Sequence, residues 1–206
     1  MTEPARLILA SASPRRRELL TLLGMPHEVE PSRIDEASIA ADHPRTFALR
    51  AAYAKAMDVA SRAPANAWVL AADTVVARGM ILYGKPAGEA DAGRMLRELS
   101  GQRHQVVTGL ALARAGTQNV FLRAEATTVV FRELTPGEME GYVRSGEPLD
   151  KAGAYGIQGL GGELVERIEG DYYNVVGLPL RALAELLADA DLPPPAAIPP
   201  PPDRWQ

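Results

Sequence analysis

Three consecutive arginines follow two serines and a proline near the start of the chain, in the segment Ser11-Ala12-Ser13-Pro14-Arg15-Arg16-Arg17. Ser13 is a good N-cap and Pro14 suits the first helical position, so the arginines are expected in the first turn or so of a helix. The helix dipole already presents positive charge there, and each exposed cation adds an unfavourable ~0.3–1 kcal/mol. A bound phosphate would reverse that sign, because it would meet free backbone N–H groups, hydroxyls and guanidinium groups together. Taken alone, a solvated basic helix surface explains the run equally well.

Asp73 lies within an otherwise apolar segment. Of the eleven residues from Ala67 to Ala77, only Asp73 and Thr74 are polar. The carboxylate is therefore expected in, or at the end of, a buried strand. Partial burial raises the pKa of a carboxylate and makes it a better proton acceptor near neutrality, whereas a bound cation lowers that pKa. For such a residue alone, a structural role in capping the next turn is the more common outcome.

Further residues complete a set of the kind used in phosphoryl or nucleotidyl transfer. Asp35 and Glu36 stand on a predicted loop, Lys55 in an alanine-rich helix, and Lys85 between a glycine and a proline. Each is commonplace alone, but together cations can hold phosphates while carboxylates hold Mg²⁺ or activate water. Gln158, beside a glycine-rich segment, has an amide able to read a base edge, although a buried glutamine bonded to backbone is commoner.

Alternating strand and helix patterns must position these residues. Apolar runs predict strands at 6–10 and 67–72, and the runs 104–114 and 118–131 predict a long antiparallel hairpin. Caps, leucine spacing and glycine stops predict helices at about 14–23, 44–62, 88–99, 136–145 and 179–189. Residues 153–162, rich in glycine and alanine, are expected to form a loop. This order predicts an α/β fold with a mixed twisted sheet flanked by helices.

The composition excludes several classes of protein. The 206 residues are 47% hydrophobic and 23% charged, and no apolar run nears the ~18 residues of a membrane span. The net charge of −4 opposes nucleic-acid binding, and the absence of cysteine removes disulfides and cysteine-ligated metals. Seven of the 17 prolines fall in 193–202, so we expect one folded domain, 1–191, and an extended or disordered tail, 192–206. No signal peptide is recognisable, which makes the cytoplasm the expected location.

Seven segments together resemble the Maf family of nucleoside triphosphate pyrophosphatases, also called septum formation inhibitors. They are residues 7–20 (LILASASPRRRELL), 34–36, 71–76 (AADTVV), 84–86 (GKP), 99–109, 148–162 and 170–180. The resemblance implies hydrolysis between the α- and β-phosphates, a fold similar to that of inosine triphosphate pyrophosphatases, frequent dimers and a divalent cation, Mg²⁺ or Mn²⁺. It also implies that Asp73 is the proton acceptor. The other polar active-site positions that it implies are Ser11, Arg16, Glu36, Lys55 and Lys85, and we expect Glu36 and Asp73 to be the metal ligands.

Three positions separate the branches of that family. Arg15, Thr74 and Gln158 resemble the branch that acts on dTTP and UTP, whereas the 7-methyl-GTP branch typically has Trp, Gln and Glu there. The resemblance thus implies a nucleoside triphosphate as the partner and the removal of non-standard nucleotides, with a link to cell-division arrest. A rival hypothesis is a regulator of septum formation that binds a nucleotide without turning it over. Another is a nucleic-acid-binding module, which the net charge and the 5% aromatic content oppose.

Overall fold

A seven-stranded mixed sheet forms the centre of the protein in a computed structural model that describes residues 6–41 and 43–206. The strands are β1 (Leu7–Leu9), β2 (Glu28–Val29), β3 (Trp68–Arg78), β4 (Ile81–Tyr83), β5 (Arg103–Arg114), β6 (Val120–Phe131) and β7 (Val165–Glu169). Their order is β2-β1-β3-β5-β6-β7, and β4 pairs with β3. β1 is parallel to β2 and β3, and the other pairs are antiparallel. The predicted α/β class and the long hairpin, β5–β6, are confirmed.

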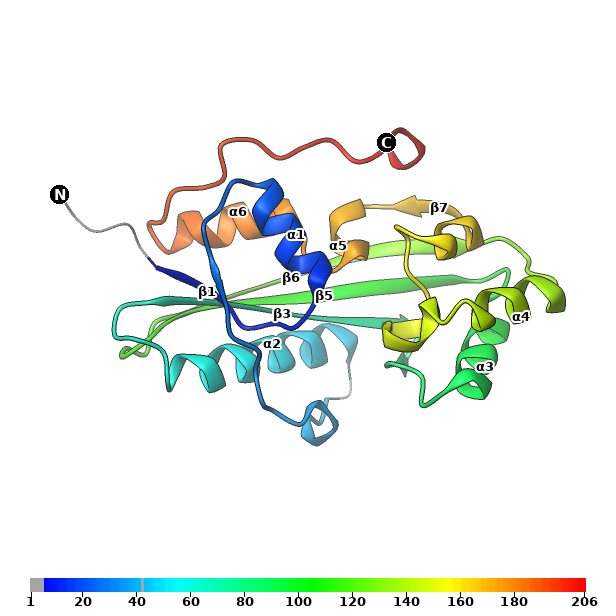
Figure 1. Cartoon of the computed structure of the whole chain (residues 1–206), viewed down its shortest axis with the longest axis horizontal. Helices are drawn as coiled ribbons and strands as arrows, with labels where there is room; N and C mark the ends of the chain where they lie inside the picture. Colours follow the sequence, from blue (N-terminus) through cyan, green and yellow to red (C-terminus); the bar gives the residue numbers. More distant parts are fainter. Residues whose placement is uncertain (1–5, 42) are drawn as a thin grey trace.

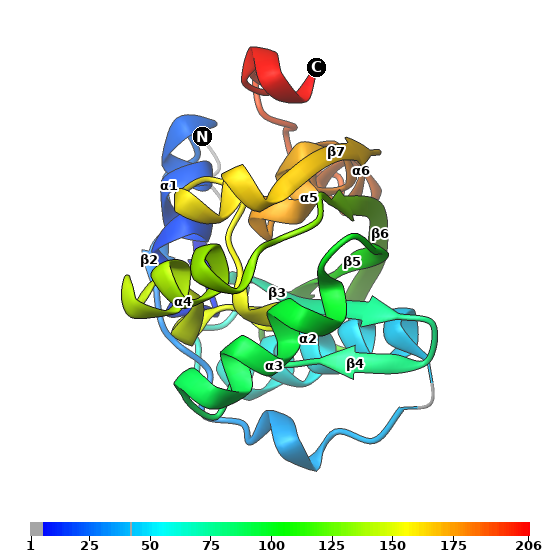
Figure 2. The same ribbon diagram turned by 90° about the vertical axis from the view of Figure 1, so that its right-hand side faces the viewer.

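Helices cover both faces of this sheet. They are α1 (Pro14–Leu22), α2 (Pro44–Ala60), α3 (Glu89–Leu99), α4 (Pro136–Arg144), α5 (Tyr172–Val176) and α6 (Leu180–Asp189). Figure 1 shows α2 beneath the sheet, α1, α5 and α6 above it, and α3 and α4 gathered at one end; Figure 2 gives the view turned by 90°. Among the described residues, none of these helices is long and apolar enough to cross a membrane.

Small side chains let α2 approach the sheet closely. The core between them consists largely of alanines, including Ala52 and Ala56 of α2 and Ala71 and Ala111 of the strands. The opposite face of the sheet buries larger leucines and aromatic residues instead. The alanines bring the backbone of α2 near β3. The long side chain of Lys55 on the helix can therefore reach the short side chain of Asp73 on the strand.

The edge of β3 is uncovered between β1 and β4. β1 ends with Leu9 opposite Leu70, whereas β4 pairs with β3 only from Val76 onward. Residues 71–75 therefore have a paired strand, β5, on one side only within the described chain. Since side chains alternate along a strand, Asp73 points toward α2 and Thr74 toward α1, where each finds a partner. One opening at this edge thus gives access to both faces of the sheet.

Several predicted boundaries move in the structure. The strand expected to end at residue 72 continues to Arg78, and the helix expected to reach residue 62 ends at Ala60. Leu22, one of the four leucines whose spacing predicts the buried side of the first helix, is 59% exposed. β2, β4, β7 and α5 were not predicted. They are short elements of two to five residues, too short to show a clear pattern in the sequence.

The C-terminal segment runs over the side of the molecule formed by α6, α5 and β7 (Figure 1). Residues 193–202 form no helix or strand, and the short 3₁₀-helix η5 (Asp203–Trp205) follows them. The ring of Trp205 stacks on that of Tyr172, with centroids 6.4 Å apart. The division into a domain and a tail stays a prediction, and these packing contacts were not foreseen from the sequence.

Candidate active site

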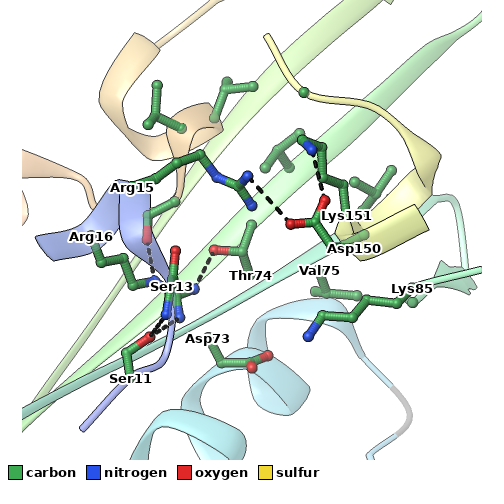
Figure 3. A pocket seen from close by; sticks show the side chains of 18 of the residues that line it. Ser11, Ser13, Arg15, Arg16, Asp73, Thr74, Val75, Lys85, Asp150 and Lys151 are labelled. Carbon is green, nitrogen blue, oxygen red and sulfur yellow. Dashed lines mark hydrogen bonds and ion pairs between the residues drawn. The ribbon is translucent and has the colours of Figure 1, made fainter. Parts of the chain in front are cut away.

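A cavity of about 910 Å³ opens at the uncovered edge of β3. Its size lies within the ~300–1,000 Å³ typical of small-molecule sites. All nine predicted site residues line it: Ser11, Arg15, Arg16, Glu36, Lys55, Asp73, Thr74, Lys85 and Gln158. Asp35, predicted beside Glu36, is not among the lining residues. The structure thus brings together side chains from α1, α2, β3 and four loops. Figure 3 shows how those of Ser11, Arg15, Arg16, Asp73, Thr74 and Lys85 lie.

The floor of the cavity is an ammonium group held between two carboxylates. Nζ of Lys55 lies 2.6 Å from Oδ1 of Asp73 and 2.6 Å from Oε1 of Glu36. Asp73 is 5% exposed and Lys55 9% exposed, whereas the side chain of Glu36, on the short 3₁₀-helix η1 (Glu36–Ser38), is 47% exposed. The buried pair therefore comes from α2 and β3, and the second carboxylate closes over it from a surface loop.

These surroundings shift the pKa values of the two carboxyl groups in opposite directions. Burial raises the pKa of Asp73, and the neighbouring Lys55 and Arg16 oppose that rise. Burial also opposes ionisation of Glu36, but the hydrogen bond from Lys55 and the nearby cations hold its pKa below the usual range. Asp73 is therefore the stronger proton acceptor of the two, and Glu36 stays ionised.

Arg16 joins three parts of the wall. Its Nη1 donates to Oγ of Ser11 at 3.1 Å, its Nη2 to Oγ1 of Thr74 at 3.1 Å, and its Nε to the carbonyl of Gly177 at 2.9 Å. Ser13 occupies the N-cap position of α1, as predicted, but its side chain makes no capping hydrogen bond. The guanidinium of Arg16 is thus fixed at the helix N-terminus before any ligand binds.

The hydroxyl of Thr74 has a second partner on the next strand. Its Oγ1 lies 2.9 Å from Oγ1 of Thr108, which donates to the carbonyl of Asn174 at 3.1 Å. Thr108 and Asn174 are fully buried. The position of Thr74 is therefore set by the sheet and by α5 as well as by Arg16.

The rim of the cavity carries the remaining cations. Nη1 of Arg15 lies 3.9 Å from Oδ2 of Asp150, and Nζ of Lys151 lies 2.7 Å from Oδ1 of the same carboxylate. Figure 3 shows Lys85 extending into the cavity from the side away from Arg16. Gln158 is exposed, so the commoner interpretation, a buried glutamine bonded to backbone, does not hold.

Sequence reasoning missed four lining residues with charged or phenolic side chains, Glu147, Asp150, Lys151 and Tyr155. Glu147 and Asp150 belong to the short 3₁₀-helix η2 (Glu147–Asp150), directly before the predicted glycine-rich loop. The only signal in the sequence was the charged pair Asp150-Lys151 beside that loop, because a charge next to a glycine-rich turn can bind its backbone.

Residues 6–190 match the family model described as Maf-like protein. The chain is 53% identical over 186 residues to a dTTP/UTP pyrophosphatase of Gloeobacter violaceus, which covers 90% of this chain and 96% of that protein. It is 54% identical over 185 residues to a dTTP/UTP pyrophosphatase of Moorella thermoacetica, with coverages of 89% and 94%. A solved structure of a HAM1 protein from Coxiella burnetii gives a TM-score of 0.43 at 18% identity over 62% of this chain and 73% of its own. The family match and the relatives show that this chain belongs to the Maf family.

Proposed function

We propose that this protein is a nucleoside triphosphate pyrophosphatase that hydrolyses dTTP and UTP to the monophosphate and pyrophosphate. Relatives of 53% and 54% identity over most of the chain bear that name. The observation that carries the proposal is the meeting of cations and carboxylates in one cavity, with Lys55 between Glu36 and Asp73. A protein that only bound phosphate would need the cations but would not need a buried Asp73.

The triphosphate would lie across the start of α1. Backbone N–H groups at a helix N-terminus and the helix dipole both favour an anion, which would also offset the repulsion between Arg15 and Arg16. Arg16 has five N–H donors and uses three of them on Ser11, Thr74 and Gly177, so two remain for phosphate oxygens. Lys85 supplies a charge from the other side of the cavity.

Asp73 would be the general base. Its carboxylate accepts a proton from the water that attacks the α-phosphorus, and burial makes it a stronger acceptor than an exposed aspartate. Lys55 orients that carboxylate through its short contact and can neutralise charge that develops on the phosphate. The pyrophosphate leaves with the β- and γ-phosphates held by the remaining cations.

The donor set of the floor fits a divalent cation bound together with the substrate. Mg²⁺ prefers carboxylate oxygens and substrate phosphates to an all-protein cage. Glu36 and Asp73 offer such oxygens around one point, which Lys55 occupies in the structure. Among the described residues, no group of three or more His, Cys, Asp or Glu side chains could hold a metal by itself. When bound, Mg²⁺ or Mn²⁺ would neutralise phosphate charge, and Glu36 and Asp73 would hold it.

Residues at the rim of the cavity would recognise the pyrimidine base. Gln158 presents one acceptor and one donor, which match the N3–H and O4 of uracil or thymine in one orientation of the amide, whereas the reversed amide would match cytosine. A preference for uracil and thymine therefore requires that the orientation of this amide is fixed. Arg15 stands near that edge of the cavity and is held by Asp150. A homodimer and a cytoplasmic location stay predictions from the resemblance and the sequence.

Pyrophosphate release from dTTP, UTP, CTP, 7-methyl-GTP and ITP with Mg²⁺ or Mn²⁺ tests the proposal. We expect dTTP and UTP to be the best substrates, and Asp73→Asn to lose ~10²–10⁴-fold in kcat. Asp189→Asn, at an exposed carboxylate on α6, is the control and should keep full activity. Binding of dTTP without turnover would instead establish the nucleotide-binding regulator. Near-full turnover by Asp73→Asn would remove that residue from catalysis.

A further inference from the structure

The loop that carries Gln158 is short and rich in glycine, and its last residues begin the 3₁₀-helix η4 (Leu160–Leu164). It runs from Gly156 to Gly161, and three of its six residues are glycine. Glycine loses more conformational freedom on ordering than any other residue, so such a loop adopts one shape only where outside contacts hold it. Gln158, at its exposed centre, lines the cavity.

Glu147 holds the far end of this loop. Its Oε2 accepts the N–H of Leu160 at 2.9 Å, and its Oε1 accepts the N–H of Gly161 at 3.1 Å. A Cβ at Gly159 would lie 2.4 Å from Oε2, so the backbone wraps around the carboxylate more closely than any side chain permits. Successive N–H groups converging on one anion form a backbone nest, which here is filled by a residue of the protein itself.

Tyr142 holds the near end of the loop and joins it to the same carboxylate. Its hydroxyl donates to Oε1 of Glu147 at 3.0 Å and accepts the N–H of Gly156 at 3.2 Å. Burial raises the pKa of this tyrosine, which keeps the hydroxyl protonated. Tyr142 is 6% exposed and lies in α4, whose start is fixed by the capping box of Thr135 and Glu138. One end of the loop is therefore bound to α4 directly through Tyr142, and the other end through Glu147, which Tyr142 also contacts.

We propose that Glu147 is a positioning residue that fixes Gln158 in the cavity and thereby sets the preference for uracil and thymine over other bases. The proposal rests on the proposed function, because it needs Gln158 to face the base. Glu147 touches no reacting atom; it acts through the backbone on both sides of the glutamine.

Glu147→Gln is the sharpest perturbation. The new amide has about the same shape, but its NH₂ group would face an N–H donor. One of the two hydrogen bonds that Glu147 accepts from Leu160 and Gly161 is therefore lost. We expect kcat/KM for UTP to fall about tenfold or more, the size expected for a hydrogen bond to a charged group, mainly through KM. The preference for UTP over CTP should shrink as well. Glu140→Gln, at an exposed carboxylate on α4 whose partner is Arg144, is the matched control and should behave as wild type.

A double-mutant cycle separates this proposal from the proposed function. If Glu147 acts through Gln158, then Glu147→Gln in a Gln158→Ala background should change UTP/CTP preference less than twofold. Full additivity, or a Glu147→Gln enzyme with unchanged KM and preference, would overturn the positioning role. If Gln158→Ala alone leaves the preference unchanged, the failure is in the proposed base contact.

Hydrogen exchange gives a readout that does not depend on activity. The amide of Leu160 or of Gly161, whichever faces the new NH₂ group, should exchange at least tenfold faster in Glu147→Gln than in the Glu140→Gln control, since it loses its carboxylate acceptor. If Glu147→Gln fails to fold, Tyr142→Phe replaces it, and the amide of Gly156 should then exchange faster. Unchanged protection of these amides in a folded variant would contradict the proposal that Glu147 and Tyr142 hold the loop, even if the protein hydrolysed no nucleotide.

Discussion

Gly109 sets the distance between α2 and the sheet, and its replacement by alanine should show how much the site depends on that distance. It lies on β5, opposite Asp73 on β3. An added Cβ would lie 2.3 Å from the carbonyl oxygen of Ala48, 2.4 Å from its carbon and 2.7 Å from the nitrogen of Leu49. All three atoms are backbone of α2, so no side chain can rotate away. The helix must withdraw by about 1 Å to restore an ordinary contact distance.

That displacement has a cost in stability and a cost in catalysis. Forcing one extra methyl group into a packed core costs ~1–3 kcal/mol, and rigid backbone on both sides places Gly109→Ala at the upper end. For a chain of this length, ~3 kcal/mol lowers Tm by about 6–12 °C. Lys55 follows Ala48 by seven residues, or about 10 Å along the helix, so it withdraws with the same rigid body. Its 2.6 Å contact with Asp73 lengthens, and kcat should fall.

Thermal unfolding and pyrophosphate release from UTP measure the two effects on the same samples. Gly141→Ala is the control, because its Cβ would meet nothing within 4 Å in the middle of α4, and it should stabilise by about 0.5–1 kcal/mol. A Gly109→Ala protein with the Tm of wild type would refute the close approach of α2. Lost stability with unchanged kcat would show that the distance between α2 and the sheet does not control the contact between Lys55 and Asp73.

Two further predictions concern parts of the molecule away from the floor. Burial lowers the pKa of His104 to about 4, so the unfolded chain binds the extra proton first and stability falls as the pH drops from about 6.5 to 4. Urea unfolding measures the free energy of unfolding at pH 7 and pH 4. The decrease between these two pH values should be roughly 3 kcal/mol smaller in His104→Gln than in wild type, and equal decreases would contradict a buried neutral histidine. Deleting residues 193–206 removes the stacking of Trp205 and the 2.6 Å ion pair between Arg204 and Glu163. It should lower Tm by about 3 °C, whereas an unchanged Tm would mean that the segment does not pack in solution.

Part of the lining of the cavity could be predicted from the sequence, because two groups of its residues stand out in local patterns. The anomaly of three arginines at a helix start, and that of one acid in an apolar strand, each pointed to a place in the chain. The three arginines differ in their location in the structure. Arg15 and Arg16 line the cavity, whereas Arg17 is exposed outside it. A run of like charges in a sequence cannot show which members share a face with a partner.

The arrangement of the site could not be predicted, because it depends on contacts between distant segments. The opening exists because β1 stops at Leu9 and β4 stops at Tyr83, and neither end is marked in the sequence near Asp73. The lysine was expected to hold phosphate, yet it also separates the two expected metal ligands. Glu147 carries no local signal of its role, since its partners are amides 13 and 14 residues further on.

The hydrogen bonds around Thr74 limit what that residue can offer a substrate. Thr108 donates to the carbonyl of Asn174, so the proton between the two threonines must come from Thr74. Thr74 also accepts a hydrogen bond from Arg16, which leaves its oxygen with one lone pair and no proton to donate. It could therefore accept only one further bond, such as one from the N3–H of a pyrimidine. Its main effect is then exerted through Arg16, because replacing Thr74 would release one of the three contacts that hold that guanidinium at the start of α1.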